Sequence, residues 1–175
     1  SYQVEKGEVK LLDEETVKFQ YDLLISRLER ASYINYEFSN FGKSGFHSVN
    51  NNNYWSGKQY LGIGPSAHSF DGHRLRSWNI SNNLKYLKSI EKGCLPQTKE
   101  VLKDHEVFNE YVMIGLRTKG VKISRVNESF GSNYQVFLEK QVKKHLLNRR
   151  LFWDGNVLKV SKHARFLTDG IASDL

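Results

Sequence analysis

The sequence predicts a mixed α/β fold in two parts, which we place at residues 1–95 and 96–175. The first part shows the order strand, helix, strand, which is typical of parallel strands in a sheet covered by helices. The second part contains mostly helical patterns and one β-hairpin signal, an order that indicates a winged-helix-like domain. The segment Leu95-Pro96-Gln97 lies between the two parts and is predicted to be a linker.

The first part is built around a helix that opens at Asp13. Asp13 is predicted to be its N-cap, and the acids that follow favour the positive end of the helix dipole. Strands are predicted on either side of this helix, at Tyr2–Val4 and Tyr33–Phe38. Helical spacing predicts that the buried face of the helix carries Val17, Tyr21, Leu24 and Leu28.

A stretch rich in Gly and Asn follows the second of these strands. Residues 43–57 are predicted to form an irregular loop, because Gly, Ser and a run of Asn disfavour regular structure. A further strand is predicted to end at Gly62-Ile63-Gly64, where glycine permits a ligand to approach the backbone. This stretch is therefore a candidate binding site. A short strand at Arg74–Trp78 and a helix at Leu84–Glu91 complete the first part.

The second part begins with predicted helices at Asp104–Thr118 and Ile123–Phe130, and a longer helix starts at Asn133. Asp154-Gly155-Asn156 lies between two apolar runs, which is a strong hairpin signal. Ser161 is predicted to cap a last helix. Helical spacing predicts a core that includes Phe108, Val112, Tyr134, Leu138, Val142, Leu146, Ala164 and Ile171.

The composition sets limits on function. The chain has 26 basic and 19 acidic residues, a formal net charge of +7, which suits an anionic partner and equally serves solubility. Cys94 is the single cysteine, so the chain forms no internal disulfide and holds neither a structural zinc nor an iron–sulfur cluster by itself. Without a signal-peptide pattern or a long apolar run, we expect a cytoplasmic protein.

Histidines and glycines provide the candidate chemistry. None of the six histidines forms a close metal-ligand pair, so we predict no metal site made by this chain alone. His68 follows the glycine-rich strand end and is the histidine in the most suggestive position; a histidine hydrogen-bonded to backbone is the alternative. Gly62 and Gly64 do not form a dinucleotide-binding fingerprint, because the third glycine and an opening helix are absent.

Nucleic-acid binding is the principal alternative from another class. The predicted long helix carries a basic set of side chains, namely Lys140, Lys143, Lys144, Arg149 and Arg150. On a recognition helix these would reach phosphates and base edges. No second basic cluster flanks the hairpin, and a basic helix face is often only solvated, so the sequence does not favour DNA binding.

Three segments in order carry a family resemblance: Tyr36-Glu37-Phe38-Ser39-Asn40-Phe41-Gly42, then Asn51-Asn52-Asn53-Tyr54-Trp55, then Gly62-Ile63-Gly64-Pro65-Ser66-Ala67-His68. The chain thereby resembles the radical S-adenosylmethionine (SAM) proteins related to oxygen-independent coproporphyrinogen III oxidase. It is most similar to the branch of heme chaperones called HemW. The segments from Glu110 to Arg117 and from Leu167 to Gly170 resemble the C-terminal domain of that family, so the likeness covers nearly the whole chain.

The resemblance implies a fold: the last βα units of a partial TIM-like radical SAM barrel, followed by the winged-helix-like domain. It also implies SAM and a [4Fe-4S] cluster held by three cysteines, which together generate a 5′-deoxyadenosyl radical. That three-cysteine motif is absent here, and the chain opens at Ser1 as if a strand were already under way. We therefore expect the C-terminal part of a longer protein, inactive without the cluster-binding half.

The resemblance also indicates which residues bind cofactors. Gly42, Ala67 and His68 match positions near SAM or the porphyrin in the family. The loop that holds Tyr54 and Trp55 is a candidate heme or porphyrin site. Asn50 stands where the chaperones carry a histidine that is a candidate heme ligand, and His47, three residues earlier, is a possible substitute.

The leading hypothesis for function is a part of a radical SAM protein of heme metabolism. It is either a heme chaperone, which the motifs favour, or a coproporphyrinogen oxidase, an oxidoreductase that decarboxylates propionates to vinyl groups in porphyrin biosynthesis. The implied partners are SAM, heme or a porphyrin, and heme-accepting proteins. The basic excess suits the propionates and the SAM carboxylate. A winged-helix module that binds nucleic acid or docks a protein is the alternative.

Overall fold

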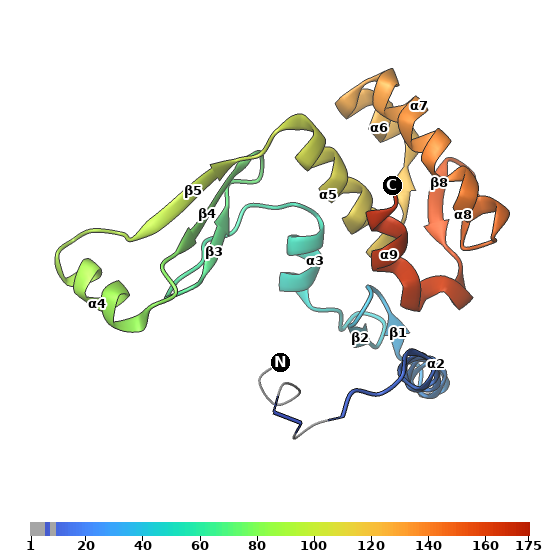
Figure 1. The fold of residues 1–175 in the computed structure, drawn as a ribbon, viewed down its shortest axis with the longest axis horizontal. Helices are drawn as coiled ribbons and strands as arrows, with labels where there is room; N and C mark the ends of the chain where they lie inside the picture. The colour runs from blue at the N-terminus through green and yellow to red at the C-terminus, as the bar shows by residue number, and fades with distance from the viewer. Residues whose placement is uncertain (1–5, 8–9) are drawn as a thin grey trace.

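The computed structural model describes residues 6–7 and 10–175. The strand predicted at Tyr2–Val4 lies outside the described residues. Figure 1 shows a small sheet that extends away from a helical C-terminal domain, with helix α5 leading from one to the other. The first part of the chain contains α2 (Glu14–Arg30), β1 (Ile34–Asn35), β2 (Phe41–Gly42), α3 (Val49–Trp55), β3 (His68–Phe70), β4 (Leu75–Asn79), α4 (Asn83–Glu91) and β5 (Gln97–Val101).

Helix α2 begins as predicted. The Asp13 carboxylate accepts a hydrogen bond of 2.8 Å from the backbone N–H of Thr16, so Asp13 is the N-cap. The predicted apolar face is wrong in part: Ile25 is the buried residue of this helix, whereas Val17 and Leu24 are exposed. Helix α2 contacts β1 along only part of its length, and much of its apolar surface is left uncovered by the described residues.

Strand β1 is shorter than predicted and is antiparallel to β2, with Ile34 opposite Gly42. The chain leaves the strand direction after Asn35, whose side-chain amide donates to the carbonyls of Glu37 and Asn40 and holds them in a turn. All strand pairs within the described part of the chain are antiparallel. The parallel pairing expected for a βαβ unit is therefore not observed there.

Two further predictions for the first part are wrong. The loop predicted at residues 43–57 contains helix α3, because the Ser48 hydroxyl accepts the backbone N–H of Asn51 and caps the run of asparagines. Among the described residues no strand ends at Gly62-Ile63-Gly64; Tyr60 forms an isolated bridge with Phe70, and strand β3 begins only at His68. Strand β4 and helix α4 confirm the elements predicted there.

Strands β3, β4 and β5 form one antiparallel sheet in that order. Leu95-Pro96-Gln97 is not a simple linker, because Gln97 begins β5 and is paired with Asn79 of β4. The division into residues 1–95 and 96–175 stays a prediction. Since β5 completes the sheet of the first part, we propose that the boundary lies nearer Leu102, between β5 and α5.

The C-terminal domain has the winged-helix-like order of elements. It contains α5 (Asp104–Arg117), β6 (Val121–Lys122), α6 (Ile123–Phe130), α7 (Ser132–Gln141), α8 (Lys143–Leu147), β7 (Leu151–Asp154), β8 (Val157–Val160), η1 (Lys162–Leu167) and α9 (Thr168–Ser173). The predicted long helix is divided at Val142 into α7 and α8. The predicted hairpin is confirmed, and β6 adds a third strand in the order β6-β8-β7.

The core of this domain is continuous. It buries Phe108, Val112, Leu116, Val121, Val126, Leu138, Val142, Leu151, Leu158, Ala164 and Ile171. Gly120 permits the close approach of α5 to the hairpin: its φ is +98°, and an added Cβ would lie 2.7 Å from the carbonyl oxygen of Leu158. None of the described helices is long and apolar enough to cross a membrane.

Candidate functional site

The sheet of the first part presents His68 on a face shared with other aromatic side chains. His68 is opposite Trp78 of β4, and their rings stack with centroids 6.1 Å apart. Trp78 is in turn opposite Thr98 of β5. Phe70 lies two residues beyond His68 on the same strand, so it projects from the same face. His68 is exposed, and Trp78 and Phe70 are half-buried.

The aromatic face continues from Phe70 to helix α3. The ring of Tyr60 lies 6.2 Å from Phe70 and 5.5 Å from Tyr54, which contacts Trp55 edge-on at 5.1 Å. We define the aromatic face as these six residues: Trp55, Tyr54, Tyr60, Phe70, Trp78 and His68. The aromatic face brings together candidate site residues of α3 and of the glycine-rich turn. Trp55 of α3 and His68 of the turn are 13 residues apart in the sequence.

Arg76 adds a guanidinium group to this face. Its guanidinium lies 5.7 Å from the centre of the Phe70 ring and forms an ion pair with Glu110 of α5. Burial raises the pKa of the Tyr60 hydroxyl, and the neighbouring Tyr54 adds to the rise, while Arg76 opposes it. Tyr60 therefore stays neutral at physiological pH, as a mainly apolar wall with a polar tip.

The glycine-rich turn is tightly held against the sheet. An added Cβ at Gly62 would lie 2.1 Å from the carbonyl oxygen of His68, so no other residue fits there without displacing β3. The buried Asn79 side chain donates to the carbonyl of Gly64 at 2.9 Å, and its backbone N–H donates to the carbonyl of Ala67 at 2.9 Å. Ala67 thus anchors the turn through its backbone, and the turn presents His68.

The loop before α3 holds Gly42 and His47 together. Gly42 is buried, and an added Cβ would lie 3.0 Å from Cδ2 of His47. The His47 ring stacks on Tyr36 at 4.3 Å, and its Nε2 atom is buried without a hydrogen-bond partner. A ligand that approaches Gly42 from this side must displace His47. Asn50 is exposed on α3, one helical turn from Tyr54, and its carboxamide is a poor iron ligand.

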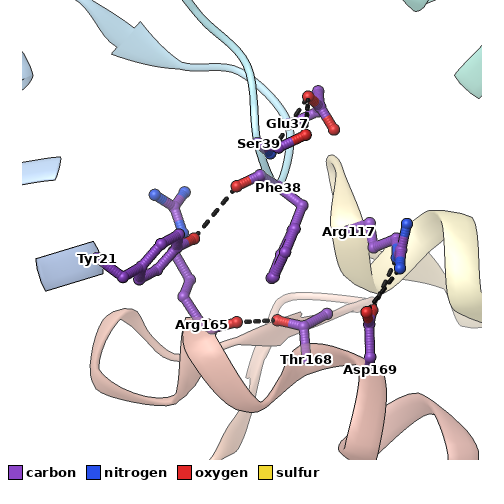
Figure 2. Close-up of polar contacts among 8 residues, drawn as sticks. All are labelled: Tyr21, Glu37, Phe38, Ser39, Arg117, Arg165, Thr168 and Asp169. Carbon is purple, nitrogen blue, oxygen red and sulfur yellow. Dashed lines mark hydrogen bonds and ion pairs between the residues drawn. The ribbon is translucent and has the colours of Figure 1, made fainter. Parts of the chain in front are cut away.

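The segment Tyr36–Asn40 docks onto the C-terminal domain (Figure 2). Glu37 is buried, and its Oε1 atom accepts hydrogen bonds of 3.2 Å from both the backbone N–H and the hydroxyl of Ser39. This turn directs Phe38 between Tyr21, whose ring is 5.9 Å away, and Arg117, whose guanidinium is 5.5 Å from the Phe38 ring.

Arg117 connects the two parts of the chain. It donates to both carboxylate oxygens of Asp169 at 2.8 Å and 2.7 Å, which is a bidentate pair. The same guanidinium lies 5.9 Å from the Trp55 ring of α3. Arg117 was not predicted to be a site component, because its partners Asp169 and Phe38 lie far away along the chain. Tyr60, Arg76 and Trp78 were not predicted either, because the ring contacts and strand pairing that bring them together leave no local pattern in the sequence. The pairing of β3 with β4 places Arg76 opposite Phe70 and Trp78 opposite His68.

The chain does not fit the iron–sulfur cluster. Cys94 is its single cysteine and is exposed. Within the described residues no group of three or more His, Cys, Asp or Glu side chains could hold a metal ion. We therefore assign no step of cluster chemistry to these residues.

Comparisons with known proteins agree on one class. No family model matches the chain. The fold matches the solved structure described as "Coproporphyrinogen III oxidase (HemN) from Escherichia coli is a Radical SAM enzyme", with a TM-score of 0.69 over 88% of this chain and 39% of that one, at 14% sequence identity. The chain therefore has the fold of part of a radical SAM enzyme.

Sequence relatives are more specific. The chain is 34% identical to the heme chaperone HemW of Bacillus subtilis over 130 residues, which are 73% of this chain and 34% of the relative. It is 30% identical to HemW of Lactococcus lactis over 85% of this chain and 39% of the relative. It is 38% identical to the mitochondrial radical S-adenosyl methionine domain-containing protein 1 of Danio rerio over 66% of this chain and 28% of the relative. The chain is thus homologous to heme chaperones and radical SAM proteins, and it spans less than half the length of these curated relatives.

Proposed function

We propose that this chain is the tetrapyrrole-facing part of a radical SAM heme chaperone. Homology to HemW and the fold shared with HemN support a role related to heme or porphyrin. The observation that carries the proposal is the aromatic face, a half-exposed series of rings that includes Tyr54, Trp55 and His68. Flat apolar ligands bind by stacking and packing on such surfaces.

A chaperone is preferred over an oxidase because the sequence relatives over the larger shares of the chain are named heme chaperones. The oxidase alternative would decarboxylate propionates to vinyl groups, with the cluster supplied by residues outside this chain.

SAM is the second proposed ligand, contacted by the backbone at Gly42 and by the turn of Ala67 and His68. Bound SAM and a [4Fe-4S] cluster would supply radical chemistry in the longer protein. This chain forms one wall of the proposed SAM site. Asn79 and Ser69 hold the glycine-rich turn in place, since the Ser69 hydroxyl accepts a hydrogen bond of 2.9 Å from the backbone N–H of Gly62. Heme-accepting proteins in the cytoplasm are the proposed partners.

A first experiment tests the radical SAM assignment in the gene. The reading frame upstream of the Ser1 codon is expected to encode C-x-x-x-C-x-x-C, the three-cysteine ligand set of the cluster. Spectra of the iron-reconstituted complete protein are then expected to show a [4Fe-4S] cluster that is lost when these cysteines are replaced by Ala. An upstream sequence without the cysteines would contradict the assignment.

A second experiment tests tetrapyrrole binding by this chain itself. Titration with hemin and with iron-free protoporphyrin IX is expected to perturb the Soret band of each, with quenching of Trp55 and Trp78 fluorescence. Asn50→His is expected to add an axial ligand on α3 and to shift the hemin spectrum further. Lack of any spectral change with both tetrapyrroles, in both proteins, would contradict the proposal.

A further inference from the structure

A hollow of about 300 Å³ lies where residues 35–38 meet the C-terminal domain. The domain contributes residues 116–120 at the end of α5, residues 159–160 of β8, and Arg165 and Thr168. The described residues that line the hollow include none of the aromatic face. Its volume is at the lower end of the range of about 300–1,000 Å³ that is typical of small-molecule sites. The hollow therefore has room for a small ligand held between the two parts of the chain.

The charge of the lining restricts the ligand. The C-terminal domain lines the hollow with four cationic residues, namely Arg117, Lys119, Lys159 and Arg165. Among the described lining residues, Glu37 is the one acidic residue that opposes them. Its Oε1 atom already accepts hydrogen bonds from the backbone N–H and the hydroxyl of Ser39. The lining thus carries an excess of positive charge, which suits an anionic ligand.

Two of the four cations are already paired with carboxylates. Arg117 forms its bidentate pair with Asp169, and the Nζ atom of Lys159 lies 2.7 Å from the Oδ2 atom of Asp154. The other two cations form no ion pair in the part of the chain that the structure describes. These two are available to a ligand.

Arg165 is the more buried of the two available cations. It is half-buried, whereas Lys119 is exposed. Its guanidinium donates a hydrogen bond of 2.7 Å to the side-chain oxygen of Asn35, which is a neutral acceptor. Figure 2 shows that its side chain extends alongside Tyr21; burial raises the pKa of the Tyr21 hydroxyl, and the charge of Arg165 opposes the rise. An anion is a stronger partner for this guanidinium than a neutral amide, because charge-assisted hydrogen bonds are the stronger ones.

We propose that this hollow binds a phosphate group, with Arg165 as its principal partner and Lys119 as the second. The cations line the hollow from the end of α5, from β8 and from η1, so a tetrahedral anion with several free oxygens can contact more of them than a planar carboxylate can. Free phosphate and the phosphate of a small ester share this chemistry. The bound group would hold the C-terminal domain against residues 35–38. The inference goes beyond the proposed function and does not depend on it, because the hollow is separate from the aromatic face.

The first test titrates the full chain with inorganic phosphate, phenyl phosphate and acetate in a calorimeter, at a constant ionic strength of about 0.15 M. Both phosphates are expected to bind at one site and to raise the melting temperature by mass action, and acetate is expected to bind much more weakly. Tighter binding of phenyl phosphate would identify an ester as the ligand, and tighter binding of inorganic phosphate would identify the free anion. Lack of phosphate binding, or acetate binding as tight as that of phosphate, would overturn the inference.

Charge variants locate the bound phosphate. Arg165→Gln is expected to weaken phosphate binding by about tenfold or more, while the new amide keeps a donor for Asn35. Lys119→Glu is expected to weaken it by about fivefold. Its matched control is Lys140→Glu, which makes the same change in net charge at an exposed residue of α7 outside the hollow. The control is expected to weaken binding by less than about twofold, because salt screens a charge outside the site.

Two results with these variants would overturn the inference, once circular dichroism has shown that each variant is folded. Unchanged phosphate affinity in Arg165→Gln would show that the guanidinium is not the partner. Equal weakening in Lys119→Glu and Lys140→Glu would show an adventitious ion only, attracted by the net charge of the chain. Both results would leave the proposed function intact, because they do not concern the aromatic face.

Discussion

The C-terminal domain and the part of the chain before it use their apolar side chains differently. From Phe108 to Ile171 the apolar residues converge on one continuous buried core. Before α5, only Ile25 and Leu102 are buried apolar residues among those described. Many large apolar residues there are exposed, including Leu11, Phe19, Phe46, Val49, Leu61, Ile63 and Leu84. The candidate site lies in the part of the chain before α5. Apolar side chains there are exposed, so they are available for contacts outside a hydrophobic core.

The sharpest test of this difference replaces one leucine in each region. Leu138→Ala removes a fully buried side chain and is expected to destabilise the C-terminal domain by roughly 2–5 kcal/mol. Leu61→Ala removes a side chain that is 77% exposed and is expected to change stability by less than about 0.5 kcal/mol. Urea unfolding followed by circular dichroism measures both. Equal losses would show that the two regions do not differ in packing.

A pair of glycine substitutions tests whether the part of the chain before α5 is tightly packed at the glycine-rich turn. Gly62→Ala places a Cβ against the backbone of His68 and is expected to cost about 1–3 kcal/mol. Gly170→Ala in α9 meets no atom within 4 Å and is expected to be neutral or to stabilise by up to about 1 kcal/mol. Thermal unfolding measures the two changes. Hydrogen exchange in β3 is expected to rise in Gly62→Ala alone, and unchanged exchange there would contradict the tight turn.

Phe38 is expected to couple the two regions. Phe38→Ala removes its contacts with Tyr21 and Arg117, and because the side chain is half-buried we expect about half of the roughly 3–5 kcal/mol lost at a fully buried phenylalanine. Limited proteolysis is expected to cut the variant between α2 and α3 faster than the unmodified chain. Phe46→Ala, at a residue that is 83% exposed, is the control. Equal cleavage of both variants would mean that Phe38 does not couple the regions.

The smallest expected effect is at alkaline pH. Burial raises the pKa of Tyr60 above its usual value near 10, so the folded state retains its proton more strongly than the unfolded state. The stabilisation is fully present below pH 10 and is lost as the pH rises through the higher folded pKa. Tyr60→Phe is expected to show a smaller loss of stability than the unmodified chain between pH 9 and pH 11 in urea titrations. An identical pH dependence would contradict the burial of Tyr60.

Local signals explain why many elements were predictable. Asp13 caps α2, Asp154-Gly155-Asn156 turns the hairpin, and Phe108 and Val112 lie inward on α5, because each depends on neighbours within a few residues. Helix α3 was not predicted, because its run of asparagines disfavours a helix and was given more weight than the helix cap that Ser48 provides. The early end of β1 was missed because it depends on hydrogen bonds between side chains and backbone in the turn.

The candidate site was predictable as a set of residues but not as a surface. His68, Tyr54 and Trp55 were identified from motifs, and the structure shows that Tyr60 and Phe70 connect them. Arg76 and Trp78 join the same face through strand pairing, which no pattern local to either residue reveals. The Arg117–Asp169 pair joins residues 52 positions apart.

The sequence by itself determined the mixed α/β class, the order of helices and hairpin, the lack of a cluster-binding cysteine set and the resemblance to radical SAM heme proteins. These properties depend on residue types and on short spacings, which the chain carries regardless of its folding. Only the tertiary structure decided which faces meet: that Gly42 is covered by His47, that Phe38 lies between Tyr21 and Arg117, and that His68 borders an open hollow. Such contacts depend on the energy of packing between distant segments, which is not encoded by any one of them.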